Sequence, residues 1–187
     1  MSRVLVPLAQ GCEELEAVTI IDILRRAGVE VVTAGLDARP VTAAHGTGLA
    51  PDTTLDRALS QSFDMVVLPG GLPGSTHLAE DPRILRLVQD MARAGKYTAA
   101  ICAAPTVLAK AGVLAGKRAT SYPGFLEGME LSDVRVENAA VVVDGKVVTS
   151  RGPGTAMDFA LELVRLLAGD AVRHDVEAAL QRPAVSA

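Results

Sequence analysis

The chain has 187 residues, of which 49% are hydrophobic and 21% charged, with a net charge of −4 at pH 7. This composition argues against a disordered chain, and the length suits one domain, residues 1–187, that needs no disulfide or metal to hold its core. Mild acidity without a Lys/Arg run argues against nucleic acid as the main partner. No apolar run approaches the roughly 18 residues of a membrane span, and two cysteines without a pairing motif favour a reducing compartment. We therefore expect a cytoplasmic protein without a membrane segment.

Strand-length apolar runs alternate with helix-period segments, which is typical of βαβ units around a parallel sheet. The expected elements of the first half are a strand over 4–8, a helix over 13–27, a strand over 29–34, a small antiparallel excursion over 39–52 and a strand over 65–68. In the second half we expect a helix over 82–94, a strand over 97–101 and a helix over 103–109. A hairpin of 134–143 with 146–149 is expected around the turn Asp144-Gly145. The chain should end with a helix from a Thr155/Asp158 capping box to Leu167, a helix over 171–180 and a frayed tail over 183–187. The pattern predicts the α/β class, with a mostly parallel sheet.

Three expected strands are followed by unusual loops, 11–16, 69–71 and 101–103. Because ligands bind at the carboxyl edge of parallel sheets, we expect these loops to converge there. Cys102 lies at a strand-to-helix corner between small residues, the pattern of a nucleophile elbow. A helix N-terminus favours thiolate over thiol, so Cys102 is the candidate nucleophile. The alternative, a buried structural cysteine, is disfavoured by this placement.

Residues near Cys102 supply further candidates. Gly70 and Gly71 lack the lysine of a phosphate-binding loop; their amides could bind an oxyanion, although an ordinary turn explains the two glycines equally well. Glu16 could face the crevice as a general acid–base, or could simply complement the helix dipole, as acidic residues in a first turn ordinarily do. Cys12 lies among glutamates, which disfavour its thiolate.

The three histidines argue against two other kinds of site. His45, His77 and His174 share no ligand spacing and no Cys-x-x-Cys is present, so we expect surface histidines and no metal site. A hydrolase triad around Cys102 would need a histidine downstream, and His174 near the C-terminus is the sole candidate. A triad is therefore improbable.

Four motifs, at 11–16, 67–71, 99–105 and 149–155, together resemble the ThiJ/PfpI superfamily. Within it they are most similar to the DJ-1 branch, that of the Parkinsonism-associated deglycase and its bacterial relatives. The motifs fall in the family order and span nearly the whole chain. The resemblance implies a flavodoxin-like three-layer α/β sandwich with helices on both faces of the sheet, a nucleophile elbow, a homodimer, and no metal or organic cofactor.

The resemblance also implies roles for individual residues. Cys102 matches the family nucleophile, Glu16 the carboxyl that hydrogen-bonds its sulfur, and Gly71 and Ala103 the amides of the oxyanion pocket. The family's activities imply a glyoxalase or deglycase that acts on methylglyoxal, other small reactive aldehydes or early glycation adducts, with nucleic acid entering only as a glycated substrate. The alternative is an oxidative-stress sensor or chaperone-like protein with an oxidisable Cys102.

Two positions depart from the family pattern. Tyr122 precedes a proline where several glyoxalase-active members have histidine. Tyrosine, with a reference pKa of about 10, donates a hydrogen bond but does not shuttle protons near neutral pH, which argues against strong glyoxalase turnover. His45 lies where relatives can have an arginine near the subunit interface. It is a candidate for an anion-friendly pocket, with an ordinary surface position as the alternative.

Overall fold

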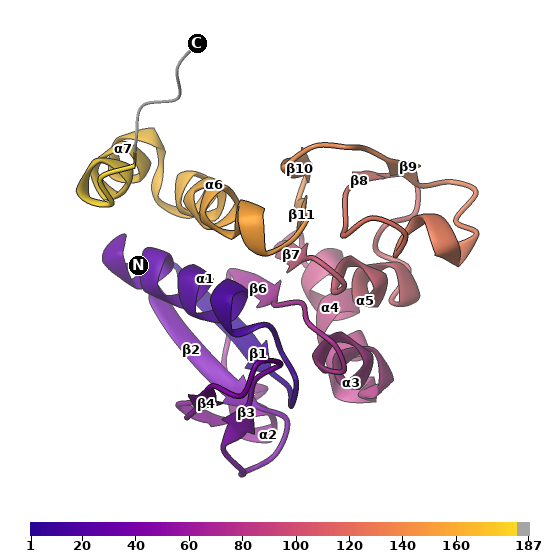
Figure 1. Ribbon diagram of the computed structural model, residues 1–187, viewed down its shortest axis with the longest axis horizontal. Coiled ribbons are helices and arrows are strands. Elements are labelled where there is room, and N and C mark those ends of the chain that lie inside the picture. Colours follow the sequence, from indigo (N-terminus) through magenta and orange to yellow (C-terminus); the bar gives the residue numbers. More distant parts are fainter. Residues whose placement is uncertain (183–187) are drawn as a thin grey trace.

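The computed structural model describes residues 1–182 and contains a central seven-stranded sheet in the order β10-β11-β7-β6-β1-β2-β5 (Figure 1). The strands are β1 (Arg3–Leu8), β2 (Glu30–Gly35), β5 (Thr53–Thr54), β6 (Met65–Leu68), β7 (Tyr97–Ile101), β10 (Val141–Asp144) and β11 (Val147–Ser150). The other strand pairs of the sheet are parallel, whereas β10 runs antiparallel to β11 and closes that edge as a hairpin. The predicted mostly parallel sheet is confirmed.

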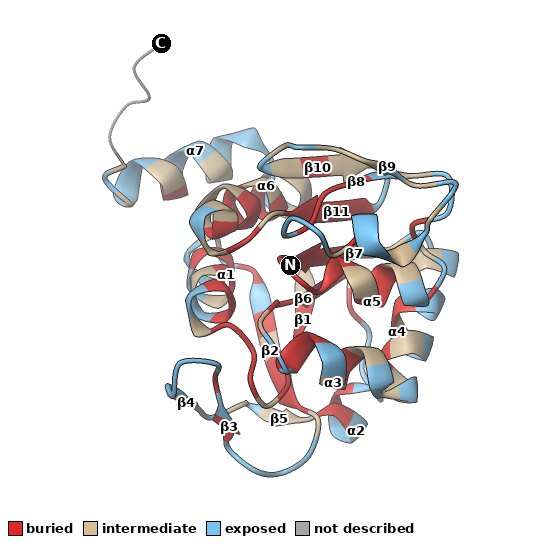
Figure 2. Ribbon diagram, turned by 45° about the vertical axis from the view of Figure 1, so that its right-hand side comes forward, coloured by how far each residue is buried: buried red, intermediate tan, exposed pale blue. Residues whose placement is uncertain are grey.

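Helices cover both faces of this sheet. They are α1 (Glu14–Arg26), α2 (Leu55–Ala58), α3 (Gly74–Glu80), α4 (Pro82–Arg93), α5 (Pro105–Lys110), α6 (Ala156–Ala168) and α7 (Asp170–Ala179), with short 3₁₀ turns η1 (Glu127–Met129) and η2 (Pro153–Thr155). One apolar core joins the sheet to α1 and α6, and a second joins its other face to α2, α3, α4 and α5. Figure 2 shows these two buried layers on either side of the strands. The fold is the expected three-layer α/β sandwich.

Sequence periodicity missed or misjudged several local features. It predicted neither α2 nor α3. The expected strand over 134–143 is divided into β9 (Arg135–Val136), which pairs with β8 (Arg118–Ala119), and β10. The Thr155/Asp158 capping box is absent because the Thr155 hydroxyl accepts the Gly152 N–H, 3.1 Å away, and no side chain caps α6. The antiparallel excursion is confirmed by the pair β3 (Val41–Thr42) and β4 (Gly48–Leu49).

The edge strand β10 has a partner outside the sheet. Arg118 of β8 donates a side-chain hydrogen bond to the Val143 carbonyl at 3.1 Å, and its backbone N–H donates to the Asp144 carboxylate at 2.9 Å. The segment that carries β8 thereby covers part of this edge.

None of the helices within residues 1–182 combines the length and the apolar content that crossing a membrane requires. The tail predicted over 183–187 lies outside the described residues.

Candidate active site

Cys102 occupies a strained corner directly after β7. Its φ of 64° is left-handed, a conformation that costs a non-glycine residue roughly 1–2 kcal/mol. Two backbone bonds hold the corner, because the Cys102 N–H donates to the Ser150 carbonyl at 3.0 Å and its carbonyl accepts the Tyr122 N–H at 2.8 Å. The side chain is 9% exposed, so the thiol is nearly enclosed. The corner is the nucleophile elbow that the small flanking residues predicted.

Glu16, in the first turn of α1, is fully buried beside Cys102. Its Oε2 accepts the Gly70 N–H at 2.8 Å. Burial raises the pKa of Glu16 from 4.5 to about 7, although hydrogen bonds from Gly70 and from the Cys102 thiol work in the opposite direction. The Glu16 carboxyl thus packs in the interior against Gly70 and Cys102, although it belongs to the first turn of α1.

Burial also changes the pKa of the Cys102 thiol. Burial and the Glu16 carboxylate raise the pKa of Cys102 to about 12, while the backbone amides of Gly71 and Ala103 lower it. We expected a helix N-terminus to favour the thiolate; burial, and next the charge of an ionised Glu16, act in the opposite direction on the pKa of Cys102. Two buried acids in contact favour one shared negative charge over two. The backbone amides of Gly71 and Ala103 favour the thiolate, but burial has the larger effect on the pKa.

Gly70 and Gly71 allow the close approach on which this geometry depends. A Cβ on Gly70 would lie 2.5 Å from the Cys102 Cβ and 2.7 Å from the Glu16 Oε2. Gly71 has a φ of 88°, and a Cβ there would collide with the backbone N of Glu13. Both positions are therefore glycine because Cys102, Glu16 and Glu13 pack directly against this loop.

Tyr122 lies on the outer side of the elbow. The residue is 48% exposed, and its ring packs edge-on to Phe125, with centroids 6.1 Å apart. Together with Arg151 and Gly152 it lines an open surface cavity of about 280 Å³. We did not single out Arg151 from the sequence, although the motif over 149–155 contains it.

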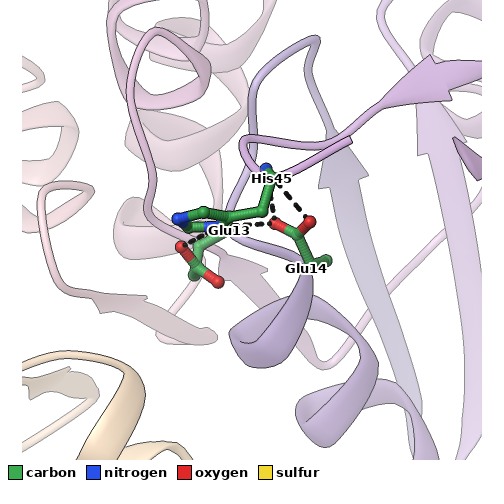
Figure 3. A group of neighbouring side chains, drawn as sticks. All are labelled: Glu13, Glu14 and His45. Carbon is green, nitrogen blue, oxygen red and sulfur yellow. Dashed lines mark hydrogen bonds and ion pairs between the residues drawn. The ribbon is translucent and has the colours of Figure 1, made fainter. Parts of the chain in front are cut away.

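His45 does not form the anion-friendly pocket considered above. Its side chain is 72% exposed, and Nδ1 lies 3.2 Å from Glu14 and 3.4 Å from Glu13 (Figure 3). Ligand atoms of these three side chains lie within 4.8 Å of one another, a proximity that their spacing of some thirty residues concealed. Hydrogen bonding to Glu14, and then the charge of Glu13, raise the pKa of His45. The two carboxylates therefore bind the histidine and repel an anion.

The other cysteine and the other two histidines remain to be placed. Cys12 is fully buried, and burial together with the Glu14 charge raises its pKa to about 11, in line with the expected poor thiolate. His77 is half-buried on α3 with Nδ1 3.0 Å from the Gln10 carbonyl, so only His45 and the exposed His174 match the expected surface positions.

Comparison with known proteins agrees with this geometry. A model of the DJ-1/PfpI family matches residues 2–166. Protein dj-1beta of Drosophila melanogaster is 46% identical over 166 residues, covering 88% of this chain and 89% of the relative, and a glutathione-independent glyoxalase, DJR-1.2 of Caenorhabditis elegans, is 38% identical, covering 86% and 85%.

Solved structures extend the likeness to three dimensions. The crystal structure of Drosophila DJ-1beta has a TM-score of 0.93 at 43% identity, covering 98% of this chain and all of that one. The structure of oxidized Toxoplasma gondii DJ-1 has a TM-score of 0.92 at 37% identity, covering 96% and 98%. An elbow cysteine, a buried carboxyl facing it and a family match over most of the sequence lead to one conclusion. The chain belongs to the DJ-1/PfpI family.

Proposed function

We propose that the protein is a cofactor-free cysteine enzyme that acts on small reactive carbonyls, of the glyoxalase or deglycase type. The observation that carries the proposal is that the buried Glu16 and Cys102 pack against the same glycine: a Cβ on Gly70 would lie 2.5 Å from the Cys102 Cβ and 2.7 Å from the Glu16 Oε2. The glyoxalase name of the Caenorhabditis relative supports the same reaction class.

The first step is addition to the aldehyde. Glu16 takes the thiol proton, and the thiolate of Cys102 attacks the aldehyde carbon of methylglyoxal, forming a carbon–sulfur bond. The carbonyl electrons move to oxygen, where the amides of Gly71 and Ala103 stabilise the developing charge. Glu16 returns its proton to that oxygen, which completes a hemithioacetal.

The second step isomerises and releases the product. Glu16 moves the proton of the former aldehyde carbon to the ketone oxygen, which gives an enediol. It then moves the proton of the other hydroxyl to the adjacent carbon, which gives a lactoyl thioester on Cys102. Water hydrolyses the thioester, which frees lactate and regenerates the thiol. The net reaction adds one water to methylglyoxal, and glyoxal yields glycolate by the same route.

Lactate formation from methylglyoxal tests this proposal. We expect Cys102→Ser and Glu16→Gln to lower kcat/KM by at least about 100-fold, the scale of losing a nucleophile or a general acid–base. Cys12→Ser is the matched control and should retain activity, because the buried Cys12 thiol takes part in none of the proposed steps. Undiminished turnover in either active-site variant would contradict the mechanism.

A second candidate function is oxidation sensing at the same thiol. Cys102 is 9% exposed and Cys12 is fully buried, so peroxide should reach Cys102 selectively, and a structure of oxidized Toxoplasma gondii DJ-1 has been solved. We expect intact mass after mild peroxide to show two added oxygens in the wild-type protein and none in Cys102→Ser. Equal oxidation of both cysteines would exclude a selective sensor.

We also propose that the enzyme is a homodimer in a reducing compartment such as the cytoplasm. Leu15 and Val18 are 51% and 47% exposed one turn apart on α1, an apolar face that a second copy would cover. Both cysteines are free, which suits a reducing compartment. Sedimentation should give a dimer for the wild-type chain and a monomer for Leu15→Glu; a monomeric wild type would refute the dimer.

A further inference from the structure

A second cavity, of about 590 Å³, opens at the amino-terminal end of β7, the opposite end of that strand from Cys102. It lies between α4, the segment after α5, and the start of β11. Ala92, Val113 and Val147 are among its apolar lining residues. Its volume is in the range of sites that bind small organic molecules.

The charged side chains that line this cavity all carry positive charge. They are Arg93, Lys96, Lys117 and Lys146. The whole chain has only four lysines, so three of the four lie here. Among the described residues no carboxylate lines the cavity; from outside the lining, Asp90 pairs with Arg93 at 2.5 Å, Asp64 with Lys96 at 2.8 Å and Asp144 with Lys117 at 3.6 Å.

Lys146 differs from the other cations of the cavity. Its Nζ lies 3.8 Å from the centroid of the Tyr97 ring, and within residues 1–182 it forms no ion pair. A cation–π contact holds the ammonium in place but leaves its charge without a counterion. An anion in the cavity would supply that counterion.

An unpartnered hydroxyl lies in the wall of the same cavity. Thr98 is 1% exposed, and its Oγ1 has no hydrogen-bond partner among the described residues. Ala99 and Ile101 face the core of α1 and α6, whereas Ala100 faces the core of α4 and α5, so strand alternation directs Thr98 to the α4 and α5 side, where the cavity lies. A buried hydroxyl without a partner is costly, and a ligand oxygen would satisfy it.

We propose that this cavity binds a small organic phosphate, such as a sugar phosphate or a nucleoside monophosphate. The phosphate oxygens would accept hydrogen bonds from the lysine ammonium groups and the Thr98 hydroxyl, since a phosphate offers several acceptor oxygens to donors that come from different segments. The apolar wall would contact the organic part. The site is separate from the Cys102 crevice and does not depend on the proposed carbonyl chemistry.

Isothermal titration calorimetry with adenosine 5′-monophosphate, ribose 5-phosphate and inorganic phosphate tests the proposal on the full chain. We expect saturable binding of at least one organic phosphate with a Kd below about 1 mM, weakened about tenfold by Lys146→Gln. Lys110→Gln is the matched control, because Lys110 is exposed at the end of α5 and is not part of the lining. Absence of saturable binding for all three probes, or equal loss in both variants, would overturn the proposal. Binding of inorganic phosphate alone would overturn the organic-ligand part.

Thr98→Val separates binding from folding. Valine keeps the shape and removes the unpartnered hydroxyl, so the free protein should be at least as stable as the wild type, while the organic phosphate should bind several-fold more weakly. A destabilised variant with unchanged affinity would show that the hydroxyl serves the core and not a ligand.

Discussion

Replacing Glu16 by glutamine should stabilise the protein above neutral pH while abolishing its activity. The folded protein raises the pKa of Glu16 from 4.5 to about 7, so between these values the folded state retains a proton that the unfolded chain has lost. The free energy of unfolding contributed by this group is therefore fully present below pH 4.5 and falls as the pH rises to about 7. A difference of about 2.5 in pKa corresponds to about 3 kcal/mol.

Glutamine has the same shape and can still accept the Gly70 N–H, but it does not ionise. Urea unfolding followed by far-UV circular dichroism from pH 5 to 8 should give a wild-type free energy that falls with pH relative to that of Glu16→Gln. The variant should be more stable by up to about 3 kcal/mol at pH 8. Glu80→Gln, at an exposed carboxyl on α3, is the matched control and should track the wild type. Parallel pH profiles for the wild type and Glu16→Gln would refute the raised pKa.

Three further results are expected. Gly70→Ala places a methyl group 2.5 Å from the Cys102 Cβ, so it should cost roughly 1–3 kcal/mol in urea unfolding and abolish turnover, whereas Gly128→Ala, with open space around the new Cβ, should do neither. Tyr122→His should raise kcat for methylglyoxal by supplying a group that exchanges protons near pH 7, and Tyr122→Phe should not; equal rates in both would count against a proton role. The carboxylates of Glu14 and Glu13 raise the pKa of His45. The ion pairs between the histidine and these carboxylates are therefore fully formed below pH 6.5, and they are lost as the pH rises through the pKa of His45 in the folded protein. Amide exchange of residues 43–47 should be slower, after correction for intrinsic rates, at pH 6 than at pH 8, and a pH-independent ratio would exclude this tether.

Periodicity and turn chemistry were sufficient for the parallel core. The strands next to Cys102 are short and mostly apolar, and they alternate along the chain with segments of helical period. The helix α3 was missed because its residues, Gly74–Glu80, begin in a glycine- and proline-rich motif that is typical of a loop. The prediction of a single strand over 134–143 was wrong for a different reason. Tertiary pairing divides its β-prone residues between two sheets, and no local pattern encodes that pairing.

The pKa values of the site were harder to predict from the sequence than the residues that form it. Sequence placed Cys102 at a helix N-terminus, whose dipole lowers a thiol pKa, but the size of the burial effect depends on how completely Glu16 and Cys102 are enclosed. The pairing of His45 with Glu13 and Glu14 likewise depends on how the loop before β4 folds back over α1.

The contact of Arg118 with the edge strand β10 affects the tendency of the protein to aggregate. An exposed edge strand with consecutive valines is a template for intermolecular β-pairing and aggregation. Arg118 occupies a carbonyl of this edge and adds a positive charge beside it, which are two ways in which natural sheets discourage such pairing. Loss of Arg118 would therefore shorten the solution lifetime of the folded protein through self-association, even if the chemistry at Cys102 were untouched.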